Sequence, residues 1–276
     1  MVVRLALLQM NCSGDRKQNL DRAELMIREA AGRGGQILLL PEVFHEAFFV
    51  VSLDMKYFDL AEPIPGPITD RMQALAQELG VVLVVPLYER VERSVYYNSA
   101  VVIDADGRLL GTYRKNHIPL STLFYEKLYF KPGNLGYPVF PTRFGKVGMV
   151  ICHDRHYPEG ARAVALGGAE FLLVPSATPD ASNSVPVWEK ELAAHAIFNE
   201  YFVGGLNRVG REGTYNYYGR SVIFDPSGEL LAQAGGDEEV LLADCDLDKI
   251  TQRRRSWQFF RDRRPDTYGI LTQLVP

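Results

Sequence analysis

Three residues with catalytic side chains stand where strand-like, apolar segments end: Cys152, Glu42 and Lys115. A cysteine thiol becomes a strong nucleophile when a base takes up its proton, and a carboxylate can be that base. The oxyanion that forms when a thiolate attacks a carbonyl carbon needs a positive donor nearby, such as a lysine ammonium. Together the three residues indicate covalent catalysis at a carbonyl carbon.

The segment around Cys152 has the pattern of a nucleophile elbow. An apolar stretch at 148–151 runs into Cys152, and a polar turn then leads to Pro158, which suits the first position of a helix. The start of that helix can lower the pKa of the thiol, and a neighbouring backbone N–H can point at the oxyanion. The alternative is a small buried cysteine of the core. We favour the nucleophile, because Cys152 stands past the strand among polar residues.

Glu42 and Lys115 are weaker candidates when each is considered alone. Glu42 follows Leu-Leu-Leu-Pro, where partial loss of water would raise its pKa toward the range useful for proton transfer. A carboxylate turned outward to water explains that segment equally well. Lys115 stands at a strand end, where lysines are usually solvated. Cys12 and Cys245 have no base or cation at a comparable spacing, so we expect both to be structural.

The segments that carry these residues alternate between strand and helix patterns. Residues 2–9 and 36–40 are typical of buried strands, and residues 67–79 have helical spacing that ends before Gly80. The turns at 104–107 and 225–228, Asp-Ala-Asp-Gly and Asp-Pro-Ser-Gly, each join two strand-like segments into a hairpin. The alternation predicts an α/β fold with some antiparallel strands, and the hairpins indicate two halves of comparable build.

The composition favours a globular protein that acts on a small molecule. Of the 276 residues, 47% are hydrophobic and 23% are charged, and no linker divides the chain, so we expect a single domain over residues 1–276. A net charge of −4 leaves no basic surplus to attract nucleic acid or an anionic membrane. No segment approaches the ~20 apolar residues of a membrane-spanning helix. Residues 1–10 also lack the features of a secretion signal.

The cysteine and histidine patterns exclude some kinds of site. Three cysteines without a CxxC pair argue against a disulfide framework or a structural zinc site and indicate a cytoplasmic, reducing location. His153 and His156 are three residues apart, but no third ligand stands at metal-binding spacing, so we expect no metal. The basic run at 253–255, continued at 261–264, is interleaved with aromatic residues, which favours a solvated or intersubunit face over a nucleic-acid patch.

In their order, these motifs resemble the nitrilase superfamily of carbon–nitrogen hydrolases. The strand-end segments LLLPEVF, YRKNHIP and ICHDRHYPE match that superfamily's Glu-Lys-Cys motifs. Segments 126–134, 175–178 and 261–266 also look like family segments, so the resemblance covers essentially the whole chain.

The resemblance implies both an active site and an architecture. Its triad is Glu42, Lys115 and Cys152, with Glu126 as a second active-site carboxylate that helps to place water. The implied fold is a four-layer α-β-β-α sandwich with mixed sheets, whereas periodicity alone supports only the α/β class. Homodimers or larger homo-oligomers are implied, with the C-terminal tail at about 255–276 packed at a subunit contact. Neither a metal nor an organic cofactor is implied.

Within the superfamily, the chain most resembles hydrolases of N-carbamoyl compounds. We expect an N-carbamoyl amino acid, such as N-carbamoyl-β-alanine, to be converted through a cysteine thioester to a free amine, CO2 and ammonia. Arg155 matches a position where carbamoyl amino acid hydrolases carry an arginine for the substrate carboxylate, while the carbamoylputrescine enzymes tend not to. A guanidinium suits a carboxylate; the alternative is a surface salt bridge, for example to Glu159. The alternatives for the reaction are N-carbamoylputrescine hydrolysis, an ω-amidase or a nitrilase on the same triad. A catalytically inactive binding module is the alternative from another class.

Further residues are expected around the substrate. The backbone N–H of His153 would join Lys115 at the oxyanion. Ser176 lies in a family-like segment and is expected to contact the substrate. His117 is expected in the pocket, as is His156, although a structural, hydrogen-bonded histidine explains either residue equally well.

Overall fold

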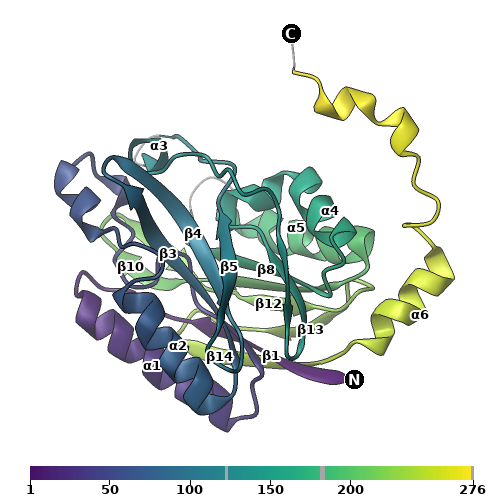
Figure 1. Cartoon of the computed structure of the whole chain (residues 1–276), viewed down its shortest axis with the longest axis horizontal. Helices are drawn as coiled ribbons and strands as arrows, with labels where there is room; N and C mark the ends of the chain where they lie inside the picture. The colour runs from purple at the N-terminus through teal and green to yellow at the C-terminus, as the bar shows by residue number, and fades with distance from the viewer. Residues whose placement is uncertain (122–123, 181–183, 275–276) are drawn as a thin grey trace.

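The structure is a computed structural model that describes residues 1–121, 124–180 and 184–274 (Figure 1). Within these residues the strands form two six-stranded sheets and a two-stranded hairpin. The first sheet has the order β14 (Glu239–Asp246), β1 (Val2–Gln9), β2 (Ile37–Leu39), β3 (Val82–Glu92), β4 (Val95–Ile103), β5 (Leu109–Arg114). The second has the order β13 (Leu230–Gln233), β12 (Val222–Phe224), β9 (Phe202–Asn207), β8 (Phe171–Ser176), β7 (Gly145–Met149), β6 (Val139–Thr142). The hairpin consists of β10 (Val209–Glu212) and β11 (Tyr215–Tyr218).

The helices are of two kinds. The α-helices are α1 (Arg16–Gly32), α2 (Pro67–Leu79), α3 (Glu126–Tyr129), α4 (Pro158–Leu166), α5 (Ser184–Asn199) and α6 (Asp248–Trp257). Short 3-10 turns are η1 (Phe49–Val51), η2 (Met55–Leu60), η3 (Cys152–His156), η4 (Pro265–Thr267) and η5 (Gly269–Thr272). Helix α2 begins at a proline and stops at Gly80, which takes a left-handed φ of 67°, as its sequence predicts.

Alternate side chains of the central strands face different layers. In β1, Leu5 and Leu7 belong to the same buried cluster as Leu173 of β8, so the two sheets pack face to face. Ala6 and Leu8 point the other way and join the cluster that α1 and α2 form on the first sheet. Helices α4 and α5 cover the outer face of the second sheet (Figure 1). The predicted four-layer α-β-β-α order is therefore confirmed.

Both sheets are mixed, and their parallel strands lie at the centre. Strands β1, β2 and β3 run parallel, and so do β7, β8 and β9, while their outer neighbours run antiparallel. In each sheet, parallel strands bring their carboxyl ends to one edge. Glu42 lies just beyond β2 and Cys152 lies just beyond β7, so the fold places both at such edges.

Two parts of the chain depart from what the sequence pattern predicts. The pairing of β14 with all of β1 is not indicated by any local pattern, and it brings residues 239–246 back beside residues 2–9. The hairpin β10–β11 follows β9 and is not among the predicted elements.

Residues 258–274 lie outside the layers (Figure 1) and expose Ile270, Leu271 and Leu274. Their role at a subunit contact stays a prediction. None of the described helices has the length and apolar character needed to cross a membrane.

The contact between the two sheets depends on Gly204 in β9. A Cβ added there would lie 3.0 Å from Leu5 Cδ2 and 3.1 Å from Leu173 Cδ2. Gly204→Val should lower the free energy of unfolding by about 1–3 kcal/mol because it overfills this contact. Urea unfolding followed by circular dichroism measures the change. Gly236→Val is the control, since a Cβ at Gly236 meets no atom within 4 Å. Equal stability of the two variants would contradict the described packing of the sheets.

Candidate active site

Four predicted catalytic residues meet between the edges of the two sheets. Glu42 follows β2, Lys115 follows β5, Glu126 opens α3, and Cys152 opens η3. The side chains of Glu42, Lys115 and Glu126 are completely buried, and Cys152 is 6% exposed. The structure thus brings together residues that are up to 110 positions apart in the chain (152 − 42).

Lys115 lies between two carboxylates. Its Nζ is 2.8 Å from Glu42 Oε1, and 2.9 and 2.7 Å from Glu126 Oε1 and Oε2. Burial works to lower the pKa of Lys115, but the negative charges of Glu126 and Glu42 outweigh it and raise that pKa above its usual value. Burial raises the pKa of Glu126, as does the charge of Glu42, against the opposing effect of Lys115. The lysine therefore stays charged, and Glu126 binds a proton more readily than an exposed glutamate does.

Both oxygens of Glu42 are held by donors besides Lys115. Asn98 Nδ2 donates to Glu42 Oε1 at 2.7 Å, and the Ala177 backbone N–H donates to Oε2 at 2.8 Å. Asn98 comes from β4 and is completely buried. Neither Asn98 nor Ala177 is among the residues that the sequence predicts for the site. For Asn98, the sequence offers one indication, which is a polar residue inside a strand-like segment; for Ala177 it offers none. These donors fix the direction in which the Glu42 carboxylate points.

Cys152 takes the backbone conformation of a sharp turn. Its φ is +47°, in the left-handed region that non-glycine residues seldom occupy. The Sγ atom lies 3.7 Å from Thr178 Oγ1. Burial raises the pKa of Cys152 to about 11, and the charge of Glu42 adds to this, while Lys115 and Arg155 oppose it. The expectation that the helix start lowers this pKa is wrong: the thiol is buried beside a carboxylate.

Asp154 ties the Cys152 turn to the loop after Lys115. It is buried and accepts hydrogen bonds from Tyr113 Oη at 2.6 Å, the His117 backbone N–H at 2.8 Å and the Ile151 backbone N–H at 3.1 Å. His117 Nδ1 lies 2.7 Å from Asp154 Oδ1, and its ring stacks on Tyr157. His117 thus takes the structural, hydrogen-bonded arrangement, and it is not among the residues that line the cavity below.

A cavity opens onto Cys152. The residues that line it are Pro119, Leu120, Ser121, Phe124, Cys152, His153, Arg155, His156, Ala177, Thr178, Pro179, Ser184, Val187 and Tyr215. Burial lowers the pKa of His153 to about 4, so its ring is neutral at pH 7. Ser176, at the end of β8, is completely buried and is not among the residues that line the cavity; its Oγ lies 3.5 Å from the Val174 carbonyl oxygen.

Arg155 is held by groups of the protein. Its Nη1 donates to the Cys152 carbonyl oxygen at 3.0 Å and to Thr178 Oγ1 at 3.3 Å. Its Nε pairs with Glu191 Oε2 at 3.2 Å, and His156 Nδ1 lies 2.6 Å from the other oxygen of the same carboxylate. Arg155 therefore does form a salt bridge, but Arg155 is buried where a surface pair is the alternative expected, and its partner is Glu191 of α5 in place of Glu159.

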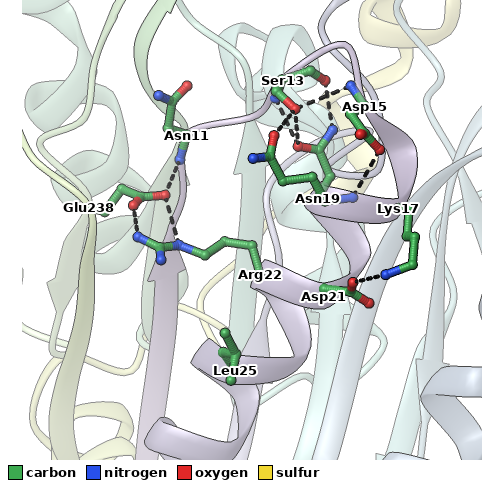
Figure 2. Close-up of a pocket in the computed structure, with 10 residues that line it drawn as sticks. Asn11, Ser13, Asp15, Lys17, Asn19, Asp21, Arg22, Leu25 and Glu238 are labelled. Carbon is green, nitrogen blue, oxygen red and sulfur yellow. Dashed lines mark hydrogen bonds and ion pairs between the residues drawn. The ribbon is translucent and has the colours of Figure 1, made fainter.

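A second hollow, at the start of α1, has a different character. Figure 2 shows that its charged groups face one another: Arg22 pairs with Glu238, and Lys17 Nζ lies 2.6 Å from Asp21 Oδ2. Asn19 in turn accepts from the Ser13 backbone N–H at 2.8 Å. The residues that line it include no thiol. In the described part of the chain, no three His, Cys, Asp or Glu side chains are grouped to hold a metal ion.

Residues 4–255 match the family described as carbon–nitrogen hydrolase. The chain is 42% identical to N-carbamoylputrescine amidase from Solanum lycopersicum, over 99% of this chain and 96% of that protein. It is 33% identical to β-ureidopropionase from Arabidopsis thaliana, over 98% of this chain and 72% of that protein.

Solved structures show the same similarity. A carbon–nitrogen hydrolase from Helicobacter pylori matches with a TM-score of 0.96 and 36% identity, over 100% of both chains. A mutant amidase from Nesterenkonia, with an acetamide moiety attached covalently to its active-site cysteine, matches with a TM-score of 0.80 and 26% identity, over 96% of this chain and 95% of that chain.

The raised pKa of Glu126 predicts a pH dependence of stability. A carboxyl whose folded-state pKa lies above its unfolded value binds more protons when folded, so stability falls as pH rises between those values. With the pKa raised from 4.5 to about 8, this contribution is lost between pH 5 and 8. Glu126→Gln should flatten the slope of unfolding free energy against pH by about 1 kcal/mol per pH unit in that window.

Urea unfolding at pH 5.5, 6.5 and 7.5 measures this slope. Glu92→Gln, at an exposed carboxylate of β3, is the matched control and should leave it unchanged. An unchanged slope in Glu126→Gln would mean that Glu126 does not titrate in this range.

Proposed function

The chain belongs to the carbon–nitrogen hydrolase family, and we propose that it hydrolyses the ureido group of an N-carbamoyl amine, with N-carbamoylputrescine as its preferred substrate. The observation that carries this proposal is the buried group of Glu42, Lys115 and Glu126 beside Cys152, whose thiol feels the charge of all three. Ala177, which donates to Glu42, lines the same cavity as Cys152. A thiol with a raised pKa needs a base before it can attack, and Glu42 can be that base while the ammonium of Lys115 can stabilise the oxyanion.

In the first half-reaction Cys152 is the nucleophile. Its Sγ attacks the ureido carbon while Glu42 takes up the thiol proton. Lys115 Nζ and the His153 backbone N–H stabilise the oxyanion. The bond from that carbon to the terminal nitrogen then breaks, and ammonia leaves with the proton that Glu42 returns. The product is an S-carbamoyl cysteine that still bears the alkylamine part of the substrate.

In the second half-reaction water replaces the leaving ammonia. Glu42 takes a proton from water as its oxygen attacks the thiocarbamate carbon, and the bond to Sγ breaks. The sulfur regains its proton from Glu42, and the released carbamate loses CO2 to give the free amine. Glu126 keeps Lys115 in place at 2.7 Å and helps to order the water. The Nesterenkonia amidase with a modified active-site cysteine supports this role for Cys152.

Two observations favour an amine over a carboxylate at the far end of the substrate. Arg155 is 3% exposed and paired with Glu191, so a substrate carboxylate would have to displace an existing ion pair. The aromatic faces of Phe124 and Tyr215 line the cavity and suit an alkylammonium. The 42% identity to the tomato N-carbamoylputrescine amidase, against 33% to β-ureidopropionase, supports the same choice. N-carbamoyl-β-alanine, the first expectation from the sequence, becomes the second candidate.

Assembly into a homodimer or larger homo-oligomer also stays a proposal. The exposed apolar residues of the tail, such as Ile270 at 70% and Leu271 at 62%, support a subunit contact there.

A substrate panel tests the reaction and its substrate together. Ammonia release should be fastest from N-carbamoylputrescine, slower from N-carbamoyl-β-alanine, and weak from simple amides and nitriles. Cys152→Ala should lower kcat by about 1,000-fold or more. Cys245→Ala makes the same change at a buried cysteine outside the cavity and should keep kcat. Absence of turnover on the whole panel would favour an inactive binding module, and turnover of nitriles alone would favour a nitrilase.

The role of Arg155 can be tested by the ratio of two substrates. If Arg155 supports the Cys152 turn, Arg155→Lys should lower kcat about 10- to 100-fold for N-carbamoylputrescine and N-carbamoyl-β-alanine alike, because the carbonyl contact is lost. The ratio of their kcat/KM values should stay within about threefold. A loss confined to the anionic substrate would instead show that Arg155 binds the substrate carboxylate.

A further inference from the structure

Arg208, at the junction of β9 and β10, is a completely buried arginine whose donors point at one turn of the backbone. Its Nη2 donates to the carbonyl oxygens of Glu42 at 2.7 Å and Val43 at 2.9 Å. Nη1 and Nη2 each lie 3.3 Å from the carbonyl oxygen of Glu46. Three carbonyls of the segment that follows β2 therefore converge on a single guanidinium.

The turn that Arg208 holds is strained. Val43 has a φ of +48°, and a β-branched residue is a poor fit to the left-handed region. Its side chain is completely buried, so this conformation is enclosed on all sides by protein. Without an external hold, the chain would relax toward negative φ, and the carboxylate of the preceding residue, Glu42, would turn with it.

The positive charge of Arg208 is balanced by Glu212, which is not one of the proposed catalytic residues. Its Nη1 lies 2.7 and 2.9 Å from the two oxygens of Glu212, and its guanidinium carbon lies 5.3 Å from the ring centre of Phe48 and 5.7 Å from that of Tyr217. Glu212 also accepts from the Phe48 backbone N–H. The guanidinium is thus fixed on one side and free to bind backbone carbonyls on the other.

We propose that Arg208 is a positioning residue that holds the strained Glu42–Val43 turn and thereby aims the Glu42 carboxylate at Lys115 and Cys152. This inference rests on the proposed function, in which Glu42 is the general base. Arg208 has no part in the chemistry itself and is not among the residues that line the cavity. It acts through Glu42, whose two oxygens meet Lys115, Asn98 and Ala177 only while the turn keeps its conformation.

Arg208→Lys keeps the positive charge but removes the planar fork that reaches several carbonyls at once. We expect kcat to fall by about 100-fold with KM changed by less than about threefold, because a misplaced base slows the chemical step and leaves binding intact.

Arg16→Lys is the matched control. Arg16 contacts the same segment through the side-chain carboxylate of Glu46, and it donates to the backbone carbonyl of Leu60. Neither contact involves Glu42 or Val43. Its kcat should stay within about twofold of the parent. Equal losses in both lysine variants, or none in Arg208→Lys, would overturn the proposal.

Substitution of Val43 provides a rescue test. In the Arg208→Lys background, Val43→Gly removes the penalty for positive φ, whereas Val43→Ala loses similar bulk and keeps that penalty. The glycine variant should regain about tenfold in kcat over the alanine variant. If Arg208→Lys alone does not yield folded protein, the Val43→Gly and Val43→Ala variants in that background are compared by the amount of folded protein that each yields. No advantage of glycine over alanine in either measurement would overturn the proposal.

Hydrogen exchange separates this inference from the proposed function. The Ala177 amide donates to Glu42 Oε2, so displacement of Glu42 should speed exchange of the segment containing Ala177 about tenfold in Arg208→Lys and leave it unchanged in Arg16→Lys. This measurement needs no turnover. A parent protein without activity on the panel would refute the proposed function, while unchanged exchange in Arg208→Lys would refute the positioning role.

Discussion

A lysine ammonium that has lost all contact with water must be surrounded by groups that replace the water, and the candidate active site is built around that requirement. The loss of hydration for a buried ion costs several kcal/mol, and only close partners with good geometry offset it. Glu42 and Glu126 are those partners of Lys115. Because Lys115 also separates the two carboxylates, each member of the cluster is tolerated inside the protein only while the others are present.

The two sheets divide the construction of this cluster between them. The first sheet supplies Glu42 and Lys115 from the ends of β2 and β5, and the second supplies Cys152 and Ala177 from the ends of β7 and β8. Their relative positions depend on the packing between the sheets, where Leu5 and Leu173 meet. The sheet interface therefore determines the geometry of this cluster as well as the stability of the fold, and a change of strand register would move these groups by more than a hydrogen-bond length.

Local patterns were enough to predict the features that depend on neighbouring residues. The strand ends before Glu42 and Cys152, the start and stop of α2, and the hairpin turns follow from apolar runs, prolines and glycines. The four-layer order and the grouping of Glu42, Lys115, Glu126 and Cys152 came from the family resemblance, since periodicity supports only an α/β sheet.

Features set by contacts between distant segments could not be predicted in this way. The pairing of β14 with β1, the Glu191 partner of Arg155 and the carbonyls bound by Arg208 involve residues far apart in the chain. The same is true of the Cys152 pKa, because its direction depends on burial and on Glu42, which no local pattern around the cysteine contains.

The raised pKa of Cys152 affects how readily its sulfur is oxidised. Peroxides and electrophiles attack thiolates, and cysteines with a low pKa and an exposed sulfur are the ones that become sulfenic or sulfinic acids. Cys152 has a pKa raised to about 11 and is 6% exposed, so between turnovers its sulfur is a poor target for these reagents. In the proposed mechanism, the burial that makes Cys152 depend on a base is thus also expected to slow its oxidation while no substrate is bound.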